Sequence, residues 1–174
     1  LLQVPAAVGW LRGFRAIFLG GGPVWPELAE AAARAALPVA LSYGLTETAA
    51  LVAALRPDEF LAGERTSGRA LPHARLAIDG DGVVRVAGAS VFRGYWPEWR
   101  EEREWVTEDL GLIDARGHLQ VLGRRDAIII TGGKKVQPAE VEAALRASGE
   151  FAEVVVIGVP DAEWGEAVVA CFPA

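Results

Sequence analysis

Ser42-Tyr43-Gly44-Leu45-Thr46-Glu47-Thr48 combines an aromatic ring, a glycine, hydroxyl groups and a carboxylate in one short stretch. A tyrosine ring offers a flat apolar surface on which a nucleotide base can stack, and a glycine lets the backbone approach a ligand closely. A threonine hydroxyl can donate to a phosphoryl oxygen, and a glutamate is a hard oxygen ligand that suits Mg²⁺. The stretch therefore predicts a nucleotide site.

The same residues also fit a structural junction between a strand and a helix. Thr46 would then cap a short helix, Glu47 would favour its first turn, and Tyr43 would lie in the core. The stretch alone leaves both interpretations open.

The segments before this stretch predict α/β structure. The run Arg15 to Gly20 indicates a short buried strand, because its centre is continuously apolar and Gly20-Gly21-Gly22-Pro23 closes it. An alanine-rich helix is expected over Pro26 to Ala36. Pro38 to Ser42 then forms a second buried strand that delivers Tyr43 to its carboxyl end, where open α/β sheets bind ligands. The glycine loop either lies against such a ligand or only makes a sharp turn.

From Gly68 onward the sequence has short apolar runs broken by turn residues. The Asp-Gly repeat at 79–82 between two such runs is a strong hairpin signal. A second turn is expected at 114–117. We interpret Gly68 to Leu122 as a small antiparallel β subdomain.

Gly123-Arg124-Arg125-Asp126 marks the expected domain boundary. Beyond it, Pro138 opens a helix that ends before Gly149, and buried strands follow at 154–159 and from 166. The sequence thus predicts an α/β fold with an antiparallel β subdomain, followed by a truncated α+β small domain. The expected limits are 1–123 for the large domain, divided into an α/β piece at 1–67 and the β subdomain at 68–123, and 124–174 for the hinge and the incomplete small domain.

The aromatic residues in the middle of the β subdomain are interpreted as core. Gly94-Tyr95-Trp96-Pro97, with Trp99 and Trp105, carries large apolar surfaces that predict burial rather than an aromatic binding box. The charged stretch 98–104 between them is interpreted as a solvated helical turn.

The composition excludes several classes of protein. Apolar residues make up 52% of the chain and charged residues 23%, which favours a packed core over disorder. The net charge of −6 argues against a nucleic acid or an anionic membrane as partner. No signal peptide is evident, and no apolar run approaches the ~20 residues that span a bilayer. The lone Cys171 excludes an internal disulfide, and His73 and His118 are too scattered for a metal-ligand cluster. We expect a cytoplasmic protein.

Two residue types are unusually scarce. The chain has no methionine, so we expect it to be an internal or processed piece of a longer protein. Its only lysines, Lys134 and Lys135, are neighbours. A mechanism that needs a lysine elsewhere must take it from outside this chain.

Four short motifs occur in an order that resembles the adenylate-forming acyl-CoA synthetases. That family carries Tyr-Gly-x-Thr-Glu, Gly-Tyr-Trp, Thr-x-Asp-Leu-Gly and Gly-Arg-x-Asp segments. Here they stand at Tyr43 to Glu47, Gly94 to Trp96, Thr107 to Gly111 and Gly123 to Asp126. Four ordered matches over most of the chain make coincidence a poor explanation.

Further stretches are similar to the 2-succinylbenzoate-CoA ligases of menaquinone and phylloquinone synthesis. They are Arg56 to Gly63, Ser67-Gly68, Leu71 to Ala74 and Ile130 to Gly133. The resemblance implies 2-succinylbenzoate as the acid, with another aromatic acid or a fatty acid as the alternative.

The resemblance also assigns roles to individual residues. It implies that Tyr43 stacks on adenine beside Gly44, that Thr46 donates to the phosphate, and that Glu47 holds Mg²⁺. The loop Gly21-Gly22-Pro23 would line the adenine and acyl side of the pocket. In the later motifs, Asp109 would accept from the ribose hydroxyls, Arg124 would contact the nucleotide, Asp126 would be the hinge, and Gly132 and Gly133 would line the tunnel for the pantetheine arm of coenzyme A.

Structural alternatives stay open for the later residues. Asp109 can be a turn aspartate that bonds its own backbone, and Arg124 can form an exposed salt bridge. Glu108 departs from the family pattern, in which many members carry glycine. It adds negative charge without removing the acceptor for the ribose.

The implied reaction joins a carboxylic acid to ATP, releasing pyrophosphate, and the thiol of coenzyme A then displaces AMP. ATP, Mg²⁺ and coenzyme A are therefore the expected cofactors and co-substrates. The family's phosphate loop and its catalytic lysine have no match here, so we expect the chain to need the remaining segments of its enzyme and to be inactive alone. A non-catalytic module that binds AMP or an acyl-adenylate is the alternative. The monomer and the homo-oligomer both stay open.

Overall fold

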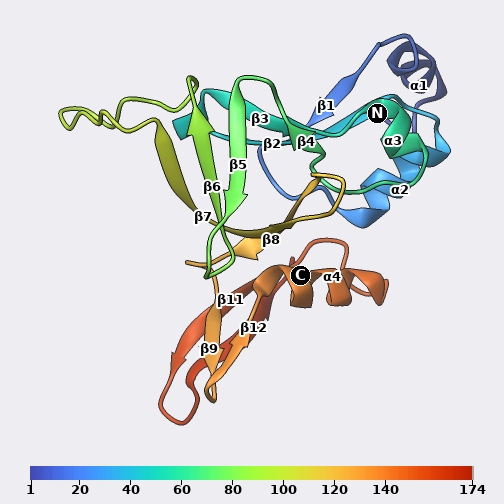
Figure 1. The fold of residues 1–174 in the computed structure, drawn as a ribbon. Coiled ribbons are helices and arrows are strands. Elements are labelled where there is room, and N and C mark those ends of the chain that lie inside the picture. The colour runs from blue at the N-terminus through green and yellow to red at the C-terminus, as the bar shows by residue number, and fades with distance from the viewer. Residues whose placement is uncertain (174) are drawn as a thin grey trace. The chain divides into compact units, whose positions relative to one another are not determined.

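The computed structural model describes residues 1–173 (Figure 1), and its chain divides into two compact units. The first unit holds Leu1–Thr107 and Gly111–Leu122, and the second holds Glu108–Leu110 and the chain from Gly123 onward. No helix within residues 1–173 combines the length and the apolar character needed to cross a membrane.

A four-stranded sheet in the order β1-β2-β3-β4 carries the first part of the chain. Its strands are β1 (Ile17–Leu19), β2 (Val39–Leu45), β3 (Ala50–Ala54) and β4 (Arg69–Ala70). Strands β1 and β2 are parallel because helix α2 (Pro26–Arg34) returns the chain between them, and the other pairs are antiparallel. The remaining helices are α1 (Pro5–Leu11), α3 (Pro57–Leu61) and the 3₁₀ turn η1 (Thr46–Thr48).

The second sheet has the order β5-β6-β7-β8 and confirms the predicted antiparallel β structure. Its strands are β5 (Ala74–Ile78), β6 (Val83–Gly88), β7 (Glu104–Ile113) and β8 (Leu119–Arg124). The β5–β6 hairpin turns at the Asp-Gly repeat, where Asp79 Oδ1 accepts hydrogen bonds from the N–H groups of Asp81 and Val83.

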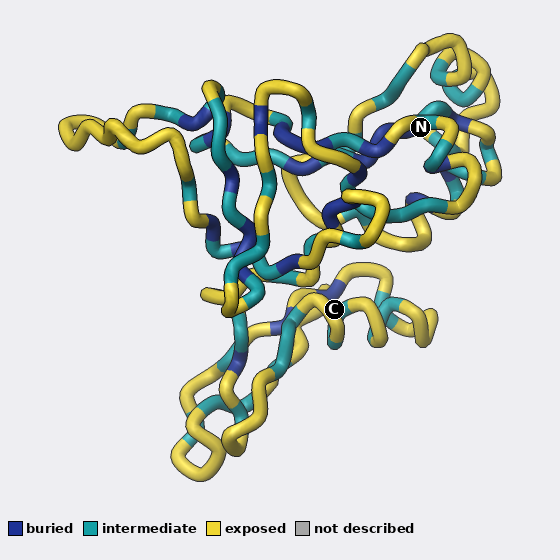
Figure 2. The backbone as a smooth tube through the Cα atoms, in the orientation of Figure 1, coloured by how far each residue is buried: buried dark blue, intermediate teal, exposed yellow. Residues whose placement is uncertain are grey.

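Two apolar clusters hold the first unit together. One combines residues of both sheets, including Tyr43, Val52, Val84 and Leu119. The other packs α2 and α3 against the first sheet, with Phe60 at its centre. In Figure 2, the buried residues of these strands are coloured dark blue. Burial of such side chains contributes about 1.5–3 kcal/mol each.

The prediction of an aromatic core around Trp96 is wrong. Tyr95 is 59% exposed, Trp96 84% and Trp99 68%. The loop from Ser90 to Arg103 contains no helix or strand, so the predicted helical turn is also absent. This loop belongs to the connection between β6 and β7 in Figure 1. Tyr95, Trp96 and Trp99 belong to no strand or helix that could place them against the core. Of the aromatic residues predicted to be core, Trp105, inside β7, does pack on the first cluster, as does Phe92 from the loop.

The second unit is an antiparallel sheet covered by one helix. Its strands are β9 (Ile129–Thr131), β10 (Lys134–Val136), β11 (Val155–Asp161) and β12 (Gly165–Cys171), in the order β10-β9-β12-β11, and its helix is α4 (Pro138–Ala147). Both lysines lie exposed in β10. The predicted fold class, α/β with an antiparallel β part followed by a partial α+β unit, is confirmed.

Candidate functional site

A cleft of about 700 Å³ opens at the carboxyl ends of β1 and β2, a size typical of ligand pockets. Three segments line it: the end of β1 with its loop, the end of β2 with η1, and the start of β3. The lining residues are Phe18, Gly20, Gly21, Ser42, Gly44, Leu45, Thr46, Glu47, Ala50 and Leu51. Four of the predicted site residues, Gly21, Gly44, Thr46 and Glu47, therefore share one cleft.

Strand alternation places the cleft residues on one face of the sheet. Phe18 pairs with Ala40 in the parallel register, so Phe18 and Gly20 face the same side as Ser42 and Gly44. The Ser42 hydroxyl donates to the carbonyl oxygen of Leu19 at 3.1 Å, and a Cβ on Gly20 would stand 2.4 Å from Ser42 Oγ. The loop after β1 thus lies close against β2 because Gly20 has no side chain.

Gly44 is required by the protein's own backbone. A Cβ at this position would lie 1.9 Å from the carbonyl oxygen of Ala50. The register between β2 and β3 also shifts between Tyr43 and Gly44, as at a β-bulge. The glycine therefore brings β3 close to β2, which is a different reason from the ligand contact that the sequence suggested.

A tight turn presents Thr46 and Glu47 to the cleft. The buried Thr48 hydroxyl accepts a hydrogen bond from the Leu45 N–H at 3.0 Å and lies within 3.1 Å of the carbonyl oxygens of Leu45 and Ala50. Ala49 and Ala50 follow with φ values of 53° and 87°. Such conformations in residues other than glycine cost about 1–3 kcal/mol each and cluster at functional sites.

The Glu47 side chain is half-buried and is held by a residue from the loop between β6 and β7. The Tyr95 hydroxyl donates to Glu47 Oε1 at 2.6 Å. This hydrogen bond to a carboxylate raises the pKa of the Tyr95 phenol. No group of three or more His, Cys, Asp or Glu side chains within residues 1–173 could hold a metal ion. A single carboxylate suits Mg²⁺ nevertheless, because that ion commonly takes one or two carboxylates together with substrate phosphates and waters.

Tyr43, Gly22 and Pro23 do not line the cleft. The Tyr43 ring is 9% exposed and belongs to the apolar cluster between the sheets, on the opposite face of β2 from Ser42 and Gly44. This position matches the structural alternative for Tyr43, so stacking on adenine stays a prediction from the resemblance. Gly22 and Pro23 follow Gly21 in the same exposed loop.

The second unit brings Asp109, Arg124 and Asp126 together. Arg124 donates two hydrogen bonds to the Asp126 carboxylate, at 2.8 and 2.5 Å, and its Nη1 lies 3.6 Å from Asp109 Oδ1. The hydrogen bonds from Arg124 lower the pKa of Asp126. Asp109 is 7% exposed, whereas Arg124 and Asp126 are about half-exposed. The exposed salt bridge expected as the alternative for Arg124 is therefore present.

Gly132 and Gly133 form the turn between β9 and β10, with φ values of 54° and 76°. A Cβ on Gly132 would come within 2.7 Å of the Trp164 ring, whereas a Cβ on Gly133 would meet no atom within 4 Å. Gly132 is thus constrained by packing, and Gly133 leaves open space beside the turn.

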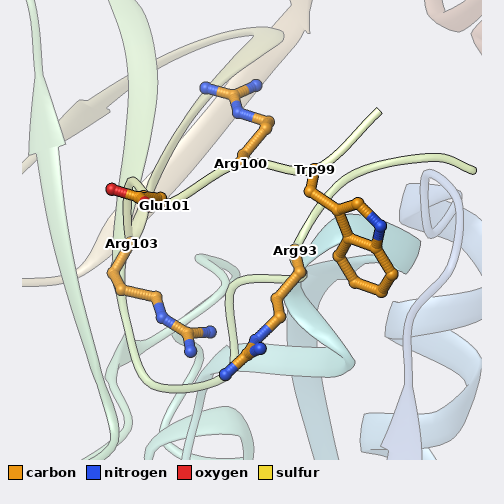
Figure 3. Close-up of a pocket in the computed structure, with 5 residues that line it drawn as sticks. All are labelled: Arg93, Trp99, Arg100, Glu101 and Arg103. Atoms are coloured by element: carbon orange, nitrogen blue, oxygen red, sulfur yellow. The ribbon is translucent and has the colours of Figure 1, made fainter. Parts of the chain in front are cut away.

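A second cavity, of about 380 Å³, lies in the loop that carries Tyr95. It is lined by Arg93, Trp99, Arg100, Glu101 and Arg103. Figure 3 shows the guanidinium ends of Arg93 and Arg103 pointing toward one another. Arg100 instead stacks over the Trp105 ring at 4.9 Å.

Sequence reasoning missed several residues of the first cleft. Phe18 was expected in a buried strand but is 57% exposed and lines the cleft with Ala50 and Leu51. Alternation along β1 carried the signal, because Phe18 lies two residues before Gly20. Tyr95 gave no local signal, since its contact with Glu47 spans 48 residues.

Comparison with known proteins gives consistent matches over both units. The model of the family described as AMP-binding enzyme matches residues 3–96, and that of the AMP-binding enzyme C-terminal domain matches residues 140–173. A 2-succinylbenzoate-CoA ligase of Geobacillus kaustophilus is 39% identical over 168 residues, which cover 88% of this chain and 34% of the ligase.

Two solved structures of o-succinylbenzoate CoA synthetase from Bacillus subtilis are also similar. The complex with the acyl-adenylate intermediate OSB-AMP has a TM-score of 0.78 and 33% identity, and the match covers 90% of this chain and 36% of that one. The complex with ATP and magnesium ion has a TM-score of 0.76 and 29% identity, covering 95% and 39%. The chain spans little more than a third of the length of these relatives.

Proposed function

Because this chain belongs to the AMP-binding enzyme family, we propose that it is part of an ATP-dependent ligase that adenylates a carboxylic acid and transfers the acyl group to coenzyme A. The observation that carries the proposal is the cleft itself, in which Thr46 and Glu47 stand together at the carboxyl ends of two parallel strands. The named relatives support 2-succinylbenzoate as the acid.

The chemical difficulty of this reaction is the approach of an anionic carboxylate to the anionic α-phosphate. Thr46 would donate a hydrogen bond to a phosphate oxygen, and Glu47 would hold the Mg²⁺ that accompanies ATP. Mg²⁺ supplies charge neutralisation when it is bound. The turn fixed by Thr48 orients both residues before the ligand arrives, which lowers the entropy cost of alignment.

Residues of the later motifs would bind the sugar and permit the second half-reaction. Asp109 would accept from the ribose hydroxyls, and Arg124, already 3.6 Å from Asp109, would contact the nucleotide. We propose Asp126 as the hinge, since its carboxylate is tied to Arg124. The open space beside Gly133 supports a role in admitting the pantetheine arm.

The test uses the protein expressed from its complete gene. With ATP, Mg²⁺, 2-succinylbenzoate and coenzyme A, we expect AMP, pyrophosphate and 2-succinylbenzoyl-CoA in equal amounts. A panel of aromatic and fatty acids then measures kcat/KM for each acid. If another acid has a higher kcat/KM, that acid replaces 2-succinylbenzoate as the proposed substrate.

Calorimetry separates a ligase from a non-catalytic module. Binding of AMP or of a stable adenylate analogue, without pyrophosphate formation from any acid, would favour the module and overturn the ligase. The exposed, free Cys171 is consistent with a reducing compartment, and we place the enzyme in the cytoplasm.

A further inference from the structure

Tyr95 contacts Glu47, a residue that lines the cleft, from a distant part of the chain. Its hydroxyl lies 2.6 Å from Glu47 Oε1, a length typical of a hydrogen bond to a charged carboxylate. The backbone N–H of Phe92 also donates to the Glu47 carbonyl oxygen at 2.8 Å. One loop therefore holds both the side chain and the peptide group of Glu47.

The Tyr95 ring is anchored although more than half of it is exposed. It packs edge-to-face on Phe92, with ring centroids 5.0 Å apart. Phe92 in turn packs edge-to-face on Trp105 at 5.1 Å and joins the apolar cluster between the sheets. The hydroxyl is thus connected to the core through a chain of aromatic contacts.

This contact leaves most of the Glu47 carboxylate available to a ligand. A carboxylate has about four acceptor positions, and Tyr95 occupies one of them on Oε1. Oε2 remains to face a cation. A carboxylate held in one rotamer loses less side-chain entropy on binding than one that is free to rotate.

We propose that Tyr95 is a positioning residue, which fixes the Glu47 carboxylate in the orientation that receives Mg²⁺ of the bound Mg-ATP. This inference rests on the proposed function for the role of Glu47. It adds the aromatic residue of the Gly94-Tyr95-Trp96 motif to the site, acting through Glu47 rather than on the substrate.

The first experiment measures pyrophosphate release by the full-length enzyme against Mg²⁺ concentration, at saturating ATP and acid. Tyr95→Phe should raise the Mg²⁺ concentration for half-maximal rate by about 10-fold, because loss of an outer partner of a metal ligand commonly costs 10–100-fold. The rate at saturating Mg²⁺ should stay close to that of the wild type. Trp96→Phe, an exposed neighbour in the same loop, is the matched control and should leave the Mg²⁺ dependence unchanged.

The pattern of the effect separates positioning from a general structural role. A variant that only loosens the loop would lower the rate at every Mg²⁺ concentration. That pattern, or a Mg²⁺ dependence equal to that of the wild type, would overturn the proposal.

The second experiment tests the hydrogen bond between Tyr95 and Glu47 without enzyme turnover. In a crystal structure of the full-length protein, the Tyr95 hydroxyl should lie within hydrogen-bond distance of Glu47 Oε1. Tyr95→Phe removes this donor and should leave the Glu47 carboxylate without a fixed orientation. A Glu47 carboxylate that keeps the same orientation in Tyr95→Phe would overturn the proposal.

Mg²⁺ affinity in the presence of ATP and absence of acid, measured by calorimetry, distinguishes this inference from the proposed function. A protein that forms no pyrophosphate but loses Mg²⁺ affinity in Tyr95→Phe would refute the ligase while supporting the role of Tyr95. An active ligase with equal affinities in both proteins would refute the role of Tyr95 alone.

Discussion

At the scale of single residues, the hydroxyl of Thr46 is the group most directly open to test. In the full-length protein, Thr46→Ala should lower the single-turnover rate of adenylation by about 100–1000-fold, as expected for loss of one positioned donor to a developing charge. The fold should persist, because Thr46 is exposed. Thr46→Ser restores the hydroxyl and should recover most of the rate. An unchanged rate in Thr46→Ala would remove this residue from the site.

Asp109→Ala should lower adenylation on a similar scale of about 100–1000-fold, because the ribose loses its acceptor. The carboxylate also lies 3.6 Å from Arg124. Asp109→Asn keeps the shape but not the charge, so a smaller loss in Asp109→Asn would show that part of the role is an acceptor. Full activity of Asp109→Ala would contradict the assignment.

Gly44 gives a residue-scale prediction about stability. Gly44→Ala should lower the free energy of unfolding by about 3 kcal/mol, because the new Cβ would overlap the Ala50 carbonyl oxygen at 1.9 Å. Gly80→Ala is the control, since its Cβ would meet no atom within 4 Å. Urea unfolding of both variants makes the comparison. Equal midpoints would mean that β3 shifts freely to accommodate the side chain.

These residues also show what the sequence could predict of the site. The presence of Thr46 and Glu47 in one cleft was predictable, because the two residues lie within one short stretch. The reason for Gly44 and the contact of Tyr95 were not, since both depend on segments that pair only after folding.

At the scale of elements, helix α4 was predicted accurately because Pro138 and Gly149 mark its ends. Its attachment to β11 was not readable from the sequence. Glu142 accepts a hydrogen bond from the Val156 N–H at 2.9 Å, and Arg146 donates to the Val154 carbonyl oxygen at 2.9 Å. An ordinary helical i,i+4 pair thus also fastens the helix to the sheet.

These hydrogen bonds predict that substitutions of two glutamates on the same helix have unequal effects on stability. Glu142→Ala should lower the free energy of unfolding by about 1–3 kcal/mol, because the Val156 N–H loses its acceptor. The exposed Glu140, in the first turn, is the matched control, and Glu140→Ala should change stability by less than about 0.5 kcal/mol. Thermal unfolding of the two variants tests this. A larger loss in Glu140→Ala would assign the stabilisation to the helix terminus instead.

The loop from Ser90 to Arg103 is the element for which the prediction from the sequence was wrong. Large aromatic side chains usually indicate burial, and that rule succeeded for Trp105, which lies in β7. It failed for Trp96 and Trp99, because the local sequence forms no strand or helix that could place them against a core.

At the scale of the whole molecule, the order of motifs and the alternation of apolar residues were enough to predict the classes of structure. The charge pairs that connect elements within the first unit were not predictable. Arg69 donates to Glu59 at 2.7 Å, and Arg116 pairs with Glu64. Both hydrogen bonds lower the pKa of the glutamate concerned.

These lowered pKa values predict loss of stability in acid. A carboxylate whose pKa is lower in the folded state stabilises the fold fully above its unfolded pKa of about 4.3, and the contribution is lost as the pH falls through the folded value. We therefore expect urea midpoints to be steady from neutral pH to about pH 5 and to fall below it. Glu64→Gln should flatten this decline. A decline of the same steepness in Glu64→Gln would assign acid sensitivity to other groups.

The placement of the lysines has a practical consequence for anyone who handles this protein. Both side chains stand exposed in β10, and the chain has no others. In the full-length protein, any amine-reactive label that peptide mapping finds on a lysine of residues 1–174 must therefore lie on this hairpin, beside Gly132 and Gly133.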